Sequence, residues 1–267
     1  MNPLGIECLS AFGLHPAELI RLTAELGCSH VTLNLGPAAN RLPVYPPLCI
    51  REDAELRREL RTTLAGSGVR IGMLEGLAIT PDNSAEDFAR DLDIAADLGA
   101  AAVCAVSLER DMARTHHAFA RLTELAAGRG LVVTTEVGAG VLRRLDKALA
   151  AVAAVAHPSF RLLIDTMHFF RFGATVADFG ALDPAAVGHV QLCDVPMPAA
   201  IANYMDEALH ERRAPGDGDL PLADFLRHVP PDVVVGLEVP IRSEAERGIG
   251  PRERLARCVA QARALMA

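Results

Sequence analysis

Residues 131–166, LVVTTEVGAGVLRRLDKALAAVAAVAHPSFRLLIDT, decide the fold. An apolar, β-branched run at 131–137 is followed by an alanine- and leucine-rich helical pattern at 142–156, and a second apolar run follows at 161–166. Two strands that are joined by a crossover helix lie parallel in one sheet. This stretch therefore predicts one unit of a parallel α/β fold.

The same alternation of strand and helix patterns extends along the whole chain. Further strands are predicted at 4–9, 30–35, 69–74, 101–107, 187–193 and 233–239, and further helices at 16–26, 51–65, 84–98, 111–128, 175–182, 221–228 and 251–266. Eight such units with no break in composition predict a single (β/α)8 TIM barrel over residues 1–267. A doubly wound open sheet is the alternative, but no glycine-rich phosphate-binding turn follows the first strand.

The composition excludes some classes of partner. The 267 residues include 26 Lys and Arg against 34 Asp and Glu, which gives a formal net charge of −8. Binding of nucleic acid needs clustered basic side chains that neutralise phosphates, so we expect no nucleic-acid partner. No apolar run approaches the roughly 18 residues of a membrane helix, so we expect no membrane partner either.

The cysteines indicate the compartment. Six cysteines are scattered along the chain, and no two of them form a CxxC pair. This pattern is typical of free thiols in a reducing environment rather than of a disulfide framework or a zinc site. The first residues, MNPLGIECLSAFG, do not have the pattern of a signal peptide. We therefore expect a cytoplasmic protein.

Four consecutive predicted strands each carry an oxygen-bearing side chain near the end. These residues are Glu136, Asp165, Gln191 and Glu238. The carboxyl ends of the strands form the active-site face of a TIM barrel. Any one of these residues could instead cap a helix or pair with an arginine. Three converging carboxylates, however, repel one another unless a cation lies between them or their pKa values rise. The set therefore predicts one divalent metal ion, Mn2+ or Mg2+, with Co2+ as a further possibility.

Two histidines lie close to these residues in the sequence. His168 follows Asp165 by three residues, and we expect it to contact substrate rather than to cap the following loop. His189 precedes Gln191 by two residues, so it points to the same side of the strand but one layer deeper. We group His189 with the substrate-binding candidates. A supporting contact to Gln191, a buried core histidine and an alternative metal ligand remain open.

The segment at residues 194–220 is too long and too rich in proline and glycine to be a plain connector. Long loops on the catalytic face are more often functional than accidental. Within it, Arg213 could extend over the site and bind an anionic group of the substrate, although Arg212 and Arg213 could also be two solvated charges. Glu7 and Glu75 also lie near strand ends, but nothing in the sequence pairs them with the other acids.

Taken in order, these motifs resemble a known family. Glu136, Asp165-x-x-His168, His189-x-Gln191, Arg213-x-Pro-Gly-x-Gly and Glu238 resemble the sugar phosphate isomerase/epimerase family of xylose isomerase-like barrels, over nearly the whole chain. The resemblance implies one divalent metal ion and substrate contacts from His168 and Arg213, with the metal ligands at Glu136, Asp165, Gln191 and Glu238. It also makes a homo-oligomer an expectation.

One position departs from part of that family. Ketose 3-epimerases of this superfamily usually carry His where Gln191 stands, and Gln is more similar to the hydroxypyruvate isomerases and 3-dehydroshikimate dehydratases. Endonuclease IV shares the barrel, but its three-zinc site requires more histidines at strand ends than this sequence offers.

These motifs predict an enzyme that moves protons beside a carbonyl group. The expected function is a metal-dependent isomerase or epimerase of a small hydroxy-carbonyl compound, with Glu136 and Glu238 as acid and base. A lyase of the dehydroshikimate dehydratase type is the alternative, because it begins with the same proton abstraction. A barrel that binds sugar or metal without turnover is a third hypothesis.

Overall fold

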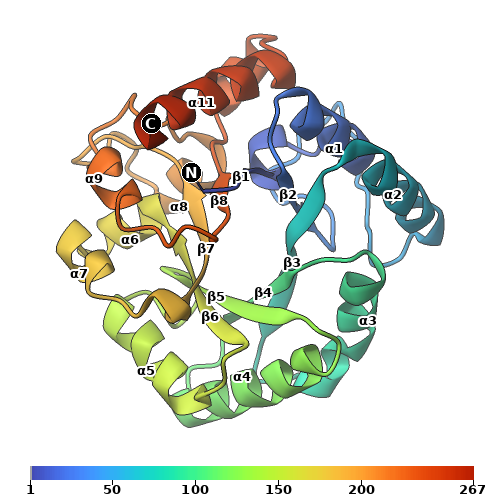
Figure 1. Ribbon diagram of the computed structural model, residues 1–267, viewed down its shortest axis with the longest axis vertical. Helices are drawn as coiled ribbons and strands as arrows, with labels where there is room; N and C mark the ends of the chain where they lie inside the picture. Colours follow the sequence, from blue (N-terminus) through green and yellow to red (C-terminus); the bar gives the residue numbers. More distant parts are fainter. Residues whose placement is uncertain (1) are drawn as a thin grey trace.

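A closed barrel of eight parallel strands forms the centre of the protein (Figure 1). The computed structural model describes residues 2–267. Each strand pairs with the next along the chain, and β8 pairs with β1. The strands are β1 (Leu4–Glu7), β2 (His30–Asn34), β3 (Arg70–Ile79), β4 (Ala102–Ser107), β5 (Val132–Val137), β6 (Phe160–Asp165), β7 (Val187–Leu192) and β8 (Val235–Leu237). The predicted (β/α)8 fold is confirmed.

Helices surround the barrel in chain order, as the colours of Figure 1 show. The outer helices are α1 (Pro16–Glu25), α2 (Ala54–Ser67), α3 (Ala89–Asp97), α4 (Met112–Ala127), α5 (Leu145–Val155), α7 (Val176–Gly180), α9 (Leu222–Leu226) and α11 (Pro251–Met266). Several of them begin where the sequence supplies a capping side chain. The Asp53 carboxylate, for example, accepts hydrogen bonds at 2.9 Å from the backbone N–H groups of Glu55 and Leu56. Within residues 2–267, no helix has both the length and the apolar character that crossing a membrane requires.

Shorter helical segments lie between these elements, and the sequence patterns did not predict most of them. They are η1 (Cys8–Ala11), η2 (Ala85–Phe88), α6 (Thr166–Arg171), η3 (Pro184–Ala186), α8 (Tyr204–His210) and α10 (Arg242–Glu246). Helical periodicity needs about three turns to be recognised, and these segments have one or two. Strand β3 also differs, because it continues to Ile79, past a register shift between Leu74 and Leu77, instead of ending at residue 74.

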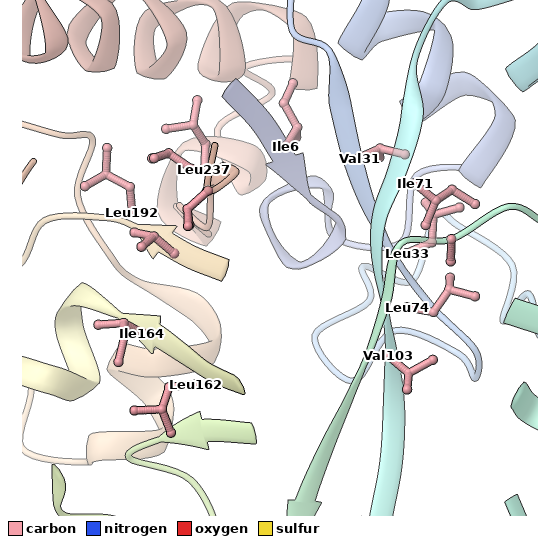
Figure 2. Close-up of a cluster of buried hydrophobic side chains, with 14 of the residues drawn as sticks. Ile6, Val31, Leu33, Ile71, Leu74, Val103, Leu162, Ile164, Leu192 and Leu237 are labelled. Carbon is pink, nitrogen blue, oxygen red and sulfur yellow. The ribbon is translucent and has the colours of Figure 1, made fainter. Parts of the chain in front are cut away.

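The core separates into an outer layer and an inner cluster. Leu162 and Ile164 of β6 belong to the large layer that packs the strands against the helices, and Figure 2 shows them with residues of other strands. Leu163, between them, belongs to a small separate cluster with Met73, Ala102 and Cys104. Side chains alternate along a strand, so Asp165 points to the same side as Leu163. At this depth the barrel interior therefore holds this apolar cluster together with the buried His189, and it becomes acidic at the strand ends.

The loop between β5 and α5 approaches this acidic end closely. Gly140 in that loop has a φ of +55°, and a Cβ at this position would overlap the carbonyl oxygen of Ser107. We expect Gly140→Ala to lower the free energy of unfolding by at least about 1 kcal/mol, measured by urea denaturation. Gly66, near the end of α2, has open space around its Cα, so Gly66→Ala should raise that free energy by about 0.5 kcal/mol. Equal stability of the two variants would contradict the predicted overlap.

Candidate functional site

A cavity of about 440 Å³ opens at the carboxyl ends of the strands. Its polar lining includes Glu75 within β3, Glu136 and Gln191 near the ends of β5 and β7, and Glu238 directly after β8. Helix α8 contributes a further wall. The cavity therefore lies where a TIM barrel carries its active site.

The structure places three of the four predicted metal ligands on this cavity and the fourth beside it. Glu136, Gln191 and Glu238 line the cavity, whereas Asp165 is fully buried. Potential ligand atoms of Glu136, Asp165 and His168 lie within 4.8 Å of one another. Those of Glu7, Glu75 and Glu238 form a second such group. The predicted set is thus divided between two neighbouring acidic groups.

Gln191 belongs to the second group through its hydrogen bonds. Its Nε2 donates to Glu7 Oε2 at 3.1 Å and to Glu75 Oε1 at 2.9 Å. The sequence did not reveal that Glu7 and Glu75 meet at the site. For Glu75 the reason is the unexpected length of β3, which places this residue within the strand rather than in the loop after it. Glu7 is the last residue of β1, a position equivalent to that of Asp165 on β6.

Arg212 lies between two of the predicted metal ligands. Its Nη1 contacts Asp165 Oδ2 and lies 2.9 Å from Glu238 Oε2, and its Nε donates to the Ala208 carbonyl at 2.8 Å. The Arg212 side chain is only 1% exposed, so its positive charge is enclosed by the two carboxylates. A buried guanidinium with two such partners is an internal counter-ion.

Arg213, the arginine that the sequence favoured, does not lie at the cavity. Its side chain is exposed, and its Nη1 donates to the Asp217 carbonyl at 3.0 Å. Arg213 forms an antiparallel bridge with Asp194, and successive side chains of an extended segment point in opposite directions. The structure therefore does not place Arg213 on this cavity, and the adjacent Arg212 takes the inward position.

His168 lies on the cavity, as its proposed substrate contact requires. Its backbone N–H donates to Asp165 Oδ1 at 2.9 Å. Asp165 thus caps the short helix α6 and fixes the position of the His168 backbone. The His168 Nε2 is 3.1 Å from Glu136 Oε1. Its Nδ1 is hydrogen bonded to the hydroxyl group of Tyr204. Tyr204 was not among the predicted site residues, because α8 was not predicted.

His189 does not reach the cavity. Its side chain is 3% exposed, and its Nε2 lies 2.9 Å from Glu7 Oε1. Its position two residues before Gln191 puts it one layer deeper in the barrel. Among the roles considered for His189, direct contact with a ligand in this cavity disagrees with the structure. A supporting role, through Glu7 and onward to Gln191, agrees with it.

The electrostatics of the site reflect an excess of negative charge. Burial, followed by repulsion from Glu7 and Glu136, raises the pKa of Glu75 to about 8. Burial and the charges of Asp165 and Glu75 raise the pKa of Glu238 well above its usual value, although Arg212 acts against this. Burial alone would also raise the pKa of Asp165, but attraction to Arg212 and His168 outweighs it and lowers that pKa. Asp165 is therefore ionised while Glu238 and Glu75 tend to keep protons.

This donor set fits a divalent cation. Five carboxylates, those of Glu7, Glu75, Glu136, Asp165 and Glu238, meet at the strand ends, and Arg212 is the guanidinium that the structure places directly between two of them. Two of the five have raised pKa values, because burial disfavours their charged forms and neighbouring carboxylates repel them. Carboxylate oxygens in excess of local positive charge are suited to a divalent cation.

The raised pKa of Glu75 predicts a pH-dependent stability in the metal-free protein. An unfolded Glu has a pKa of about 4, so between pH 5 and 8 the folded state holds a proton that the unfolded state has lost. Stability therefore falls as pH rises through this range. We expect Glu75→Gln, which cannot ionise, to reduce this fall by about 2 kcal/mol, because Glu75 is only half-buried and cavity water weakens the full effect.

Urea denaturation at several pH values, in the presence of a chelator, measures this difference. Glu55, whose side chain is 87% exposed, provides the matched control, and Glu55→Gln should retain the wild-type dependence. Equal pH dependence in Glu75→Gln and wild type would show that Glu75 is ionised at neutral pH.

Comparison with known proteins agrees with the barrel fold. Residues 20–259 match the family model of the xylose isomerase-like TIM barrel. Among curated protein sequences none matches the chain. Solved structures do match it, at identities that show a shared fold.

Three of these structures illustrate the range of the fold. The IolI protein, solved with a bound zinc atom, has a TM-score of 0.79 at 15% identity, covering 98% of this chain and 97% of its own. D-psicose 3-epimerase, solved with D-fructose, has a TM-score of 0.74 at 17% identity, covering 98% and 99%. The probable 3-DHS dehydratase AsbF of Bacillus anthracis has a TM-score of 0.71 at 16% identity, covering 99% and 98%. Because the family model matches most of its residues, the chain belongs to the xylose isomerase-like TIM barrel family.

Proposed function

We propose that this protein is a divalent-metal-dependent isomerase or epimerase of a small hydroxy-carbonyl compound. The observation that carries the proposal is the placement of Glu136 and Glu238 on one cavity, from strands that are three positions apart around the barrel. Two carboxyl groups that approach a substrate from different sides can remove a proton at one place and return it at another.

The ligands of the ion would be Glu136, Asp165, Gln191 and Glu238, with Mn2+ or Mg2+ preferred and Co2+ possible. When bound, the ion would polarise a substrate carbonyl and its neighbouring hydroxyl group and so ease removal of the adjacent proton. Because Arg212 Nη1 already contacts Asp165 and Glu238, its guanidinium has to share these carboxylates with the ion or withdraw from them.

The protein groups would divide the proton transfer as follows. Glu136, held by the His168 Nε2 at 3.1 Å, faces the cavity as the base. Glu238, which lines the same cavity directly after β8, would act as the acid. Return of the proton to the neighbouring carbon makes the enzyme an isomerase, and return to the opposite face makes it an epimerase.

Arg143 is suited to bind an anionic end of the substrate. It lies in the loop between β5 and α5, is exposed, and lines the same cavity. In residues 2–267 the neighbouring Arg144 pairs with Asp146 at 2.9 Å, whereas no carboxylate forms an ion pair with Arg143. Since two carboxylates already neutralise Arg212, Arg143 takes the role that the sequence assigned to Arg213. The proposed substrate therefore carries a carboxylate or phosphate group.

A lyase of the 3-dehydroshikimate dehydratase type is the second candidate. Two observations favour it, namely the amide of Gln191 at a strand end of the cavity and the similarity in fold to AsbF. The same base would remove the first proton, and loss of a β-hydroxyl group would replace proton return.

Deuterium exchange tests the proposal directly. The protein is incubated in D2O with Mn2+ or Mg2+ and a panel of hydroxy-ketones, ketoses and 3-dehydroshikimate, and proton NMR follows the carbon beside the carbonyl. We expect metal-dependent exchange with one substrate, which a chelator abolishes. Glu136→Gln and Glu238→Gln keep the side-chain shape but cannot transfer the proton, so each should lower turnover by at least about a hundredfold.

The exposed Glu55→Gln variant should keep the wild-type rate. Near-wild-type rates in both cavity variants would contradict the acid and base roles. An unsaturated product would favour the lyase. If metal is bound but no compound of the panel shows exchange or product, a binding protein without turnover would be favoured.

The proposed role of Arg143 has its own matched control. Arg143→Gln should raise KM for an anionic substrate by about tenfold to a hundredfold and leave KM for a neutral analogue nearly unchanged. Arg144→Gln removes an adjacent guanidinium that is occupied elsewhere, and steady-state kinetics should show no change in it. Equal effects of the two variants would show that Arg143 does not bind the substrate.

A further inference from the structure

Helix α8 forms a fixed wall of the cavity. Tyr204, Met205, Ala208 and Leu209 of this helix line the cavity, at spacings that belong to one helical face. The opposite side is held to the barrel, because Glu207 Oε1 accepts from Arg171 Nη2 at 2.7 Å in an ion pair whose side chains are 2% and 10% exposed. The position of Tyr204 is therefore fixed by packing outside the cavity.

Tyr204 makes a side-chain hydrogen bond from this wall to the acidic floor. Its hydroxyl group is hydrogen bonded to the His168 Nδ1, and the two rings lie with their centroids 5.5 Å apart. Phe172 contacts the Tyr204 ring at 5.4 Å between centroids, so the phenol is packed between two aromatic neighbours. The other His168 nitrogen, Nε2, lies 3.1 Å from Glu136 Oε1. One imidazole ring thus joins Tyr204 to Glu136.

The proton positions in this chain of contacts follow from donor chemistry. Burial lowers the pKa of His168, but attraction to Asp165 and Glu136 outweighs it and raises that pKa, and a charged ring carries a proton on both nitrogens. When the ring is neutral, a tyrosine hydroxyl group that retains its proton donates it to the unprotonated Nδ1, which leaves the ring proton on Nε2. Burial, together with the charges of Asp165 and Glu136, raises the pKa of Tyr204, which agrees with a retained proton. The Nε2–H then donates to the Glu136 carboxylate. In the other neutral tautomer a nitrogen lone pair would face that carboxylate and repel it.

We propose that Tyr204 is a positioning residue that holds His168 in the Nε2–H tautomer, with this N–H directed at Glu136. The inference rests on the proposed function, in which Glu136 removes the substrate proton. Tyr204 would affect catalysis only through His168. Loss of its hydroxyl group should therefore alter the orientation of Glu136 and the chemical step, while the aromatic wall that contacts the substrate stays in place.

Nitrogen NMR of the histidine rings tests the tautomer independently of any activity. The protein is labelled with 15N-histidine and measured without substrate, before and after addition of Mg2+, at a pH above the raised pKa of His168, where its ring is neutral. The His168→Asn variant assigns the His168 signal among the nine histidines. We expect a single Nε2–H tautomer in the wild type and a mixture of tautomers in Tyr204→Phe. An identical tautomer in both proteins would overturn the proposal.

Steady-state kinetics provide a second test of the role of Tyr204. They use the substrate that the deuterium-exchange panel identifies. Tyr204→Phe should lower kcat about tenfold, with KM within about twofold of the wild type, because supporting hydrogen bonds typically contribute on this scale. Tyr45, the other tyrosine of the chain, lies outside this cavity lining, and Tyr45→Phe should match the wild type. A raised KM with unchanged kcat would overturn the proposal, because it would show that Tyr204 only lines the cavity and does not affect the chemical step. If no substrate is found, the proposed function fails and the NMR result alone decides the positioning role.

Discussion

The Arg212 guanidinium, enclosed between Asp165 and Glu238, is the contact on which the arrangement of the strand ends depends. Two buried carboxylates side by side are costly unless a cation accompanies them. The ionised Asp165 in turn accepts the backbone N–H of His168, and His168 contacts Glu136. A single buried positive charge therefore determines, through two further contacts, where the groups that face the cavity lie.

The acidic groups differ in protonation although they lie close together. Asp165 has two strong partners, Arg212 and the helix N-terminus of α6, so its charged form is favoured. Glu238 shares the same guanidinium but is also repelled by Asp165 and Glu75, so its neutral form is favoured. Environments that separate the pKa values of neighbouring carboxyl groups are what acid–base chemistry at neutral pH requires. The barrel thus holds an ionised carboxyl group, that of Asp165, beside one whose neutral form is favoured, that of Glu238.

The amino-acid sequence was sufficient for the barrel and for the strand ends of the site. Parallel strands in a closed barrel all end on one face, so Glu136, Asp165, Gln191 and Glu238 could be assigned to that face from their positions alone. The sequence did not show that these residues belong to two neighbouring acidic groups, one of which includes Glu7 and Glu75. Glu75 contacts Gln191 because β3 continues beyond the predicted end of the strand at residue 74. Glu7 contacts Gln191 because it is the last residue of β1.

The remaining differences come from the segment 194–220. Arg212 and Arg213 are neighbours in the chain, and which one points inward depends on the bridge between Asp194 and Arg213, a contact that no local pattern encodes. Tyr204 lies on a helix of seven residues, too short for a recognisable periodicity. Tertiary pairing, rather than local propensity, decides both positions.

The same segment links two parts of the protein that are otherwise separate in the chain. The strand ends hold the acidic groups, while the segment 194–220 carries the wall of the cavity together with Tyr204 and the counter-ion Arg212. In many barrels a loop can be exchanged without disturbing the strands beneath it. Here a loop taken from another barrel would have to bring its own buried guanidinium, since Asp165 and Glu238 would otherwise lose their compensating charge. A replacement of this segment would therefore change the shape of the cavity and the charge balance of its floor at the same time.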